Sequence, residues 1–263
     1  MVIPLRDENP THRVAVVTIL LIAANVLIYF FVQPQTFGVT EDFGSQQDQA
    51  SRELEFLYRN AAVPCELVQS EPLTINQLQS GCNAPGPDEL GPAAQPFPEK
   101  NVWLSALFSM FMHGGLLHLA GNMLFLWVFG NNVEDRFGYL AYPLFYLFAG
   151  VAATAAHVVT DVDSVIPVVG ASGAIAGVMG AYVVLWPGAR ILSVVPILFV
   201  FSLTRLPAGL VLGIWFVMQF FTNPNSGVAW AAHVGGFVVG AAVALFIRAL
   251  DPRSPAAAVP DVS

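Results

Sequence analysis

GASGAIAGVMGAY, residues 170–182, is the stretch that decides the fold, because glycine and alanine recur along an apolar run. Gly173 and Gly177 are four residues apart, a spacing that allows two helices to approach closely inside a bilayer. A second apolar segment, AHVGGFVVG at 232–240, has the same spacing of small residues. We therefore expect two helices in close contact within a membrane. The glycines expected to support this packing are Gly177, Gly236 and Gly240.

The composition of the whole chain also indicates a membrane protein. Of its 263 residues, 56% are hydrophobic and only 11% are charged, which is more apolar surface than one water-soluble domain can bury. The formal net charge of -8 comes mainly from acidic residues between positions 41 and 99. The sequence has no cluster of lysine and arginine of the kind that binds nucleic acid, so we expect no nucleic-acid partner.

Six apolar segments are candidates for membrane-spanning helices. They cover residues 14–32, 115–130, 139–159, 171–186, 206–221 and 231–249. If they cross the bilayer in alternating directions, most arginines fall on one side, which the positive-inside rule assigns to the cytoplasm. These arginines are Arg6, Arg13, Arg136, Arg190, Arg205, Arg248 and Arg253. We therefore expect a multi-pass protein of a prokaryotic cell (inner) membrane, with an uncleaved first helix and both termini in the cytoplasm.

Two further apolar segments are expected not to cross. Residues 103–114 are too few to span a bilayer and are predicted to form a re-entrant or interfacial helix. Residues 188–205 are expected to lie along the inner interface, because a seventh crossing there would disturb the arginine pattern. The stretch 33–98 has no sustained periodicity. It is either a small subdomain stapled by a disulfide between Cys65 and Cys82, or a flexible loop with two free thiols.

The expected architecture is therefore an all-α membrane protein of six transmembrane helices, with a long external loop between the first two. Its parts are the cytoplasmic N-terminus and first helix at 1–32, the external loop at 33–98, the core of helices two to six at 99–250, and a cytoplasmic tail at 251–263.

Polar side chains are costly inside a membrane-spanning helix, so each is a candidate for function. At a rise of about 1.5 Å per residue, Ser172 and His233 each lie roughly 22 Å from the inner ends of their segments. His118 lies roughly 20 Å from the inner end of its own segment, and Asn122 is one helical turn away from it. The sequence thus predicts these four side chains in one layer near the outer face.

This layer holds the groups that acyl transfer requires. Ser172 is a potential nucleophile, and His233 is a potential base that would take its proton. Because Ser172 opens a helix, the backbone N–H groups there, including that of Gly173, lack intrahelical partners and can stabilise an oxyanion. The side chains of His118 and Asn122 can add further donors.

Structural roles are the alternative for each polar residue. A G-x-S-G sequence alone is a weak signal, and a single histidine inside a membrane more often serves packing than chemistry; the shared depth of the four residues favours chemistry. Other polar residues are given structural roles: His113 orients the neighbouring loop, Asn25 forms a hydrogen bond between helices, and His157, Asp161 and Asp163 are ordinary residues at the end of a loop.

Four stretches of the sequence resemble the rhomboid family of intramembrane serine proteases. They are IPLRDENP at 3–10, HGGLLHLAGNMLFLWVFGNNVEDRFG at 113–138, and the two segments at 170–182 and 232–240. The resemblance implies a six-helix rhomboid bundle that cleaves transmembrane helices near the outer face with a Ser-His dyad and no acidic third member. By motif position it implies that Ser172 is the nucleophile and His233 the base, and that His118 and Asn122 form the oxyanion pair.

One position departs from the family pattern. Some members have an aromatic residue four positions after the nucleophile, where it stacks on the histidine, whereas this chain has Ala176. The sequence leaves open how the imidazole is held.

The expected partners are transmembrane protein substrates and the lipid bilayer, with no cofactor and no metal site. His113 and His118 lack acidic or thiol companions for a metal, and the sequence does not indicate an oligomeric state. Two other functions are weaker alternatives. An inactive relative that only binds helices would lack the serine or the histidine, and a transporter would need an ionisable pathway or an internal repeat.

Overall fold

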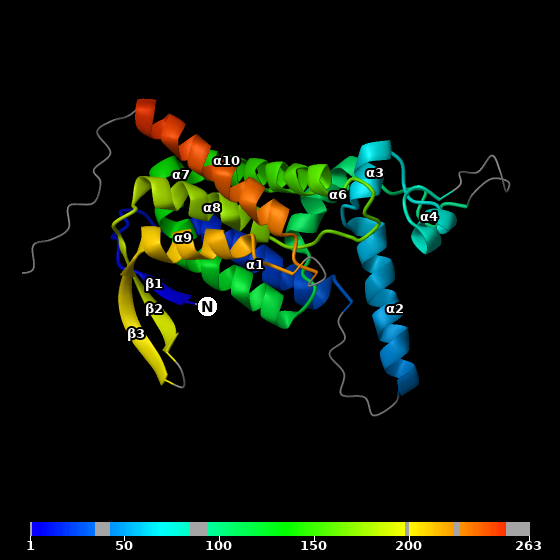
Figure 1. Ribbon diagram of the computed structural model, residues 1–263, viewed down its shortest axis with the longest axis horizontal. Helices are drawn as coiled ribbons and strands as arrows, with labels where there is room; N and C mark the ends of the chain where they lie inside the picture. Colours follow the sequence, from blue (N-terminus) through cyan, green and yellow to red (C-terminus); the bar gives the residue numbers. More distant parts are fainter. Residues whose placement is uncertain (1, 35–42, 85–93, 198–199, 224–226, 251–263) are drawn as a thin grey trace, which may run out of the picture.

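The computed structural model describes residues 2–34, 43–84, 94–197, 200–223 and 227–250. The main body is a bundle of helices that run side by side along the long axis of the molecule (Figure 1). These helices are α1 (Val16–Phe31), α7 (Leu116–Thr160), α8 (Ser172–Leu185), α9 (Ala208–Gln219) and α10 (Trp230–Leu250). The ends of the bundle differ, because a small sheet lies at one end and the short helices that follow α1 lie at the other (Figure 1).

The long helix α7 consists of two helical halves. Gly138 interrupts it with φ 80° and ψ 166°, a conformation outside the helical region that glycine adopts at little cost. The halves on either side of Gly138 correspond to the two separate apolar segments expected at 115–130 and 139–159.

Helix α8 lies at the centre of the bundle and is buried along nearly its whole length. Its glycines are in close backbone contact with α10. A Cβ atom added at Gly236 would lie 2.1 Å from the carbonyl oxygen of Gly173, and one added at Gly240 would lie 1.9 Å from that of Gly177. Even an alanine at Gly236 or Gly240 would therefore separate the two helices.

A three-stranded antiparallel sheet lies at the end of the bundle opposite α2 (Figure 1). It consists of β1 (Ile3–Asp7), β2 (Arg190–Ile197) and β3 (Val200–Pro207), in that order. The expectation of an all-α fold is therefore wrong in this part of the chain. The segment expected along the inner interface is a β-hairpin, consistent with its many β-branched and aromatic residues, and β1 covers its edge.

Glu134 of α7 joins the start of α1 to the bundle. Its buried carboxylate accepts hydrogen bonds from the backbone nitrogens of Val17 at 2.8 Å and Thr18 at 2.7 Å, and from the Thr18 hydroxyl at 2.7 Å. The first N–H groups of a helix have no partner within the helix, and the positive end of its dipole favours an anion. Glu134 thus supplies the acceptors for two backbone N–H groups in the first turn of α1.

The region between α1 and α7 is folded where the structure describes it. It contains α2 (Phe43–Asn60), α3 (Pro64–Gln69), α4 (Ile75–Ser80), α6 (Val102–Phe108) and the 3-10 helix η1 (Ser109–Phe111). Cys65 and Cys82 form a disulfide with their Cα atoms 5.8 Å apart. This finding favours the stapled subdomain over the loop with free thiols. The short helix expected at 103–114 corresponds to α6 and η1.

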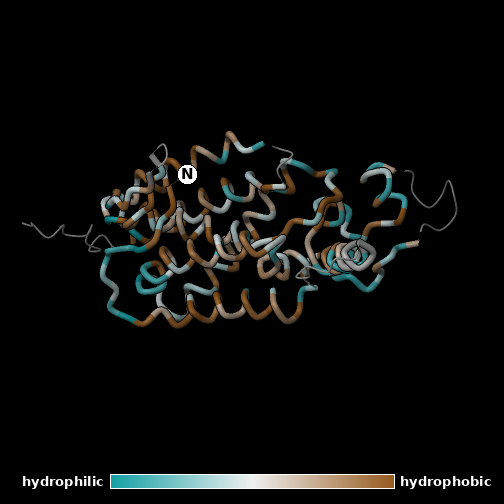
Figure 2. The backbone as a smooth tube through the Cα atoms, turned by 90° about the horizontal axis from the view of Figure 1, so that it is seen from below, coloured by the Kyte–Doolittle hydropathy of each residue, from teal (hydrophilic) through white to brown (hydrophobic). Residues whose placement is uncertain are grey.

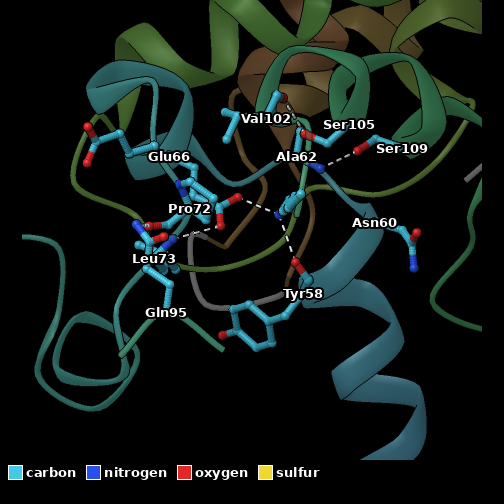
Figure 3. Close-up of polar contacts among 12 residues, drawn as sticks. Tyr58, Asn60, Ala62, Glu66, Pro72, Leu73, Gln95, Val102, Ser105 and Ser109 are labelled. Carbon is cyan, nitrogen blue, oxygen red and sulfur yellow. Dashed lines mark hydrogen bonds and ion pairs between the residues drawn. The ribbon is translucent and has the colours of Figure 1, made fainter. Parts of the chain in front are cut away.

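A buried ion pair between Lys100 and Glu66 lies inside this region, residues 43–84 and 94–111, which we call the external region after its expected position. The Lys100 ammonium also donates to the carbonyl of Tyr58 at 2.7 Å, and the Glu66 carboxylate accepts from the backbone nitrogen of Leu73 at 3.0 Å (Figure 3). Burial lowers the pKa of Lys100, although its contact with Glu66 acts in the opposite direction. These bonds hold α2, α3 and the start of α6 together.

The external region is also bonded to the loop that leads to Ser172. The backbone nitrogen of Val168 donates to the carbonyl of Ala62 at 2.8 Å, and that of Cys65 donates to the carbonyl of Ser164 at 3.0 Å. The Ser109 hydroxyl accepts from the nitrogen of Ala62 at 2.6 Å (Figure 3). The stretch 164–170 is thus held in position by backbone partners before helix α8 begins.

Hydrophobic residues dominate the helices of the bundle, and hydrophilic residues gather toward the two ends of the long axis (Figure 2). Within the described residues, α7 and α10 are long and apolar enough to cross a membrane. Shorter apolar helices cover Val16–Phe31, Val102–Phe111, Ser172–Leu185 and Ala208–Gln219.

Candidate active site

Ser172 lies at the point where an irregular segment becomes a helix. It is the first residue of α8, preceded by Ala171 and by Gly170, which has φ +124°. A Cβ atom at Gly170 would lie 2.8 Å from Cε1 of His118 and 3.6 Å from the Ser172 hydroxyl oxygen. Gly170 therefore allows the His118 ring to lie close to the serine, a role that the sequence analysis did not assign to it.

His233 of α10 is in hydrogen-bond contact with Ser172. Its Nε2 lies 2.8 Å from the Ser172 Oγ, although the two residues are 61 positions apart in the chain. The backbone contact of α8 and α10 at Gly173 and Gly236 brings these residues together. The geometry suits transfer of a proton from the hydroxyl to the imidazole.

The other side of the His233 ring contacts α9, which the sequence analysis did not predict. Its Nδ1 lies 2.7 Å from Oε1 of Gln219, and its ring centroid lies 5.7 Å from that of Trp215. Ala176 is fully buried and offers no aromatic surface. The sequence left open how the imidazole is held. The hydrogen bond with Gln219 and the ring contact with Trp215, both on α9, answer this question.

A signal for Gln219 was present in the sequence. It is a polar residue within the apolar segment 206–221, and the rule that marked Asn122 as a candidate applies to it equally. Trp215 gave no such signal, since an aromatic residue in an apolar helix is ordinary.

Ser172 and His233 face a cavity of about 570 Å³. The predicted oxyanion residues His118 and Asn122 also line it. Asn122 is 8% exposed, and among the described residues its Nδ2 has no hydrogen-bond partner. A buried donor without an acceptor costs free energy, so this amide is available to an acceptor that enters the cavity.

The His118 ring is held by contacts with Gly114 and His113. Its Nδ1 accepts a long hydrogen bond of 3.4 Å from the backbone nitrogen of Gly114. The buried ring of His113 packs edge-on against it with centroids 5.2 Å apart. The Gln33 side chain in turn holds the backbone of His113. Its Nε2 donates to the His113 carbonyl oxygen at 2.6 Å, and its Oε1 accepts from the His113 backbone nitrogen at 3.1 Å.

Two residues taken as ordinary loop-end positions belong to the cavity. His157 and Asp161 both line it, together with Ser164 and the loop at 166–169.

Asn25, expected to link two helices, donates its amide hydrogen to the Leu21 carbonyl of its own helix at 2.7 Å. Within the described ranges, no three His, Cys, Asp or Glu side chains are grouped closely enough to hold a metal.

Comparison with known proteins identifies the family. The family model of the Rhomboid domain matches residues 100–250. RHOMBOID-like protein 5 of Arabidopsis thaliana is 31% identical over 111 residues, which are 42% of this chain and 36% of the relative. The mitochondrial presenilin-associated rhomboid-like protein of Bos taurus is 33% identical over 144 residues, 51% of this chain and 35% of the relative.

A bacterial protein shows a similar level of identity. Rhomboid protease GluP of Bacillus subtilis (strain 168) is 34% identical over 140 residues, 52% of this chain and 25% of the relative. The aligned part thus spans between a quarter and just over a third of these relatives. Because the Rhomboid domain model covers more than half of the chain, this protein belongs to the rhomboid family, which includes intramembrane serine proteases.

Proposed function

We propose that this protein is a serine endopeptidase that cleaves the transmembrane segments of other membrane proteins. The observation that carries the proposal is the 2.8 Å contact between Ser172 Oγ and His233 Nε2 at the wall of a cavity inside an apolar bundle. A relative named as a rhomboid protease supports the same activity.

The reaction begins with attack of the Ser172 oxygen on the carbonyl carbon of the scissile bond. The hydroxyl proton moves to Nε2 of His233 as the new C–O bond forms. The carbonyl oxygen becomes an oxyanion, which accepts hydrogen bonds from the Asn122 amide and from the backbone N–H groups at the start of α8. His118 is a further donor at the same cavity.

Collapse of this intermediate breaks the peptide C–N bond. His233 returns the proton to the leaving nitrogen, and the acyl group remains on Ser172. Water from the cavity then attacks the ester carbonyl carbon while His233 takes a proton from it. The bond between the acyl carbon and the Ser172 oxygen breaks, the carboxylic acid product leaves, and His233 returns the proton to the Ser172 oxygen. The polar residues His157 and Asp161 at the cavity wall favour the presence of water at this depth.

The proposal includes six membrane crossings by α1, the two halves of α7, α8, α9 and α10. The sheet end, where Arg190 and Arg205 lie, then faces the cytoplasm together with both termini. The external region and the mouth of the cavity face the opposite side. The expected location is a prokaryotic cell (inner) membrane.

Cleavage of a model transmembrane substrate by the purified protein in detergent tests this function. Ser172→Ala should abolish cleavage and labelling by a mechanism-based serine reagent, because the nucleophile is removed. Ser164→Ala is the matched control, since Ser164 lines the same cavity and should be dispensable. Equal cleavage by wild type and Ser172→Ala, or labelling at another serine, would contradict the proposed mechanism.

A further inference from the structure

We propose that Gln219 is a positioning residue that completes the catalytic unit by fixing the tautomer and orientation of His233. The inference rests on the proposed protease function and extends it from two side chains to three. Gln219 is the last residue of α9, is 8% exposed, and lies 2.7 Å from the imidazole through its Oε1.

The orientation of the Gln219 amide follows from its second hydrogen bond. Its Nε2 donates to the carbonyl oxygen of Trp215 at 3.0 Å, one turn earlier in α9. Flipping the amide would place two oxygens in contact there, which is repulsive, so the carbonyl end of the side chain must face His233. An amide oxygen can only accept a hydrogen bond. The group that faces it, Nδ1 of His233, must therefore carry the hydrogen.

This assignment determines the state of the other ring nitrogen. A neutral imidazole has one N–H, so with the hydrogen on Nδ1 the Nε2 atom has a free lone pair. That lone pair faces the Ser172 Oγ at 2.8 Å. Gln219 thus selects the tautomer in which His233 can accept the serine proton, while the opposite tautomer would present an N–H to the hydroxyl.

Trp215 and Gln219 act on the ring from one helix face. They are four residues apart in α9 and so project from the same side. The Trp215 ring lies beside the imidazole with an interplanar angle of 40°, and Gln219 contacts its edge. Because Ala176 offers no stacking surface, α9 restrains the base in both position and rotation.

The role in the reaction is orientation, with no proton transferred to Gln219. When Nε2 takes the Ser172 proton, the ring becomes an imidazolium whose Nδ1 hydrogen still donates to the amide oxygen. The proton then passes from Nε2 to the leaving nitrogen, and Gln219 is unchanged throughout. A neutral amide stabilises the imidazolium less than a carboxylate does, because the carboxylate hydrogen bond is charge-assisted.

Three variants test this role in full-length protein. Gln219→Ala should lower kcat by roughly 10- to 100-fold with little change in KM, a fraction of the 10²- to 10⁴-fold effect of acid–base catalysis. Gln219→Glu keeps the acceptor and should retain activity, but its charge favours the imidazolium, so the acid limb of the pH–rate profile should move to higher pH. Met218→Ala, at an exposed neighbour on α9, is the control and should match wild type.

Nitrogen NMR of the imidazole supplies a readout that is independent of turnover. In wild type the neutral ring should carry its hydrogen on Nδ1, and in Gln219→Ala the two tautomers should be mixed. The inference is overturned if Gln219→Ala keeps wild-type kcat and tautomer while only its Tm falls. If Gln219→Ala does not fold, an unshifted profile in an active Gln219→Glu enzyme is equally decisive. Absence of cleavage by wild type would instead reject the proposed function.

Discussion

The position of the Asn122 amide at the cavity wall leads to a prediction about turnover. Asn122→Ala should lower turnover with little change in substrate affinity, because a donor aimed at the oxyanion acts mainly on the transition state. In other serine proteases one such donor is worth about 2.7 to 4 kcal/mol, or roughly 100- to 1000-fold in rate. The loss should be at the lower end here, since backbone N–H groups and His118 remain. Steady-state kinetics on a transmembrane substrate measures both parameters.

The double variant His118→Ala/Asn122→Ala should be slower than either single variant. An Asn122→Ala enzyme with wild-type turnover and a lower Tm would instead show that the amide is a structural bond between helices. In the described residues Nδ2 of Asn122 has no partner to lose, so the structure favours the catalytic outcome.

The sequence predicted which residues gather at the site because the cost of burying polar groups in a membrane singles them out. Ser172, His233, His118 and Asn122 were found in this way, and the structure brings all four to one cavity. Gln219 was missed although it met the same criterion. Gly170 could not have been found, because its importance depends on its φ and on the position of the His118 ring.

Among the elements, the sheet was the least predictable. A β-hairpin at a membrane interface and an interfacial helix have similar apolar compositions, so residues 188–205 did not distinguish them. Strand β1 (Ile3–Asp7) pairs with β2, which is far away in the sequence. Such long-range pairing leaves no local pattern. The helices were predictable because each is a long apolar run, and the turn at Gly138 falls between two such runs.

The junction of β1 with α7 predicts a pH dependence of stability. Asp7 accepts hydrogen bonds from the backbone of Asn9 at 2.8 Å and from the Asn132 amide. Burial raises the pKa of Asp7 from 3.8 to about 6, although the bond from Asn9 acts in the opposite direction. Between these two values the folded state binds more protons than the unfolded state, so stability falls as pH rises from about 4 to 6.

The size of this effect is on the order of 3 kcal/mol, at about 1.36 kcal/mol per pKa unit. Asp7→Asn removes the ionisation, so the difference in Tm between wild type and variant should change across this window and be constant above it. Thermal unfolding in detergent at a series of pH values measures it. Parallel curves for the two proteins would show that Asp7 does not titrate in this way.

For the molecule as a whole, the rhomboid resemblance is confirmed by the match to residues 100–250. Most of the external region lies outside that match. Its structure could not be derived from the sequence, since short helices with polar surfaces have little periodicity. Its structure depends on long-range contacts such as the Cys65–Cys82 disulfide and the buried Lys100–Glu66 pair. Separate backbone hydrogen bonds, from Val168 to the Ala62 carbonyl and from Cys65 to the Ser164 carbonyl, connect the external region to the loop that leads to Ser172.

This connection predicts that the disulfide stabilises the approach to Ser172. A cross-link of this loop length is worth about 3 kcal/mol, and Cys65 itself donates its backbone hydrogen to Ser164. Reduction, or Cys65→Ser with Cys82→Ser, should therefore speed hydrogen exchange at the Val168 and Gly170 amides and lower activity near the unfolding temperature. The serine variant should not respond to reductant, which separates this effect from other actions of the reagent.

The same experiment in intact vesicles tests the orientation of the chain. If the external region faces away from the cytoplasm, a membrane-impermeant reductant added outside right-side-out vesicles should reach the disulfide and accelerate exchange at Val168. Inverted vesicles should be protected, because the bilayer then lies between the reagent and Cys65. Reduction only in inverted vesicles would reverse the topology, while reduction that loosens residues 65–82 and leaves Val168 unchanged would show that the external region folds independently of the loop before Ser172.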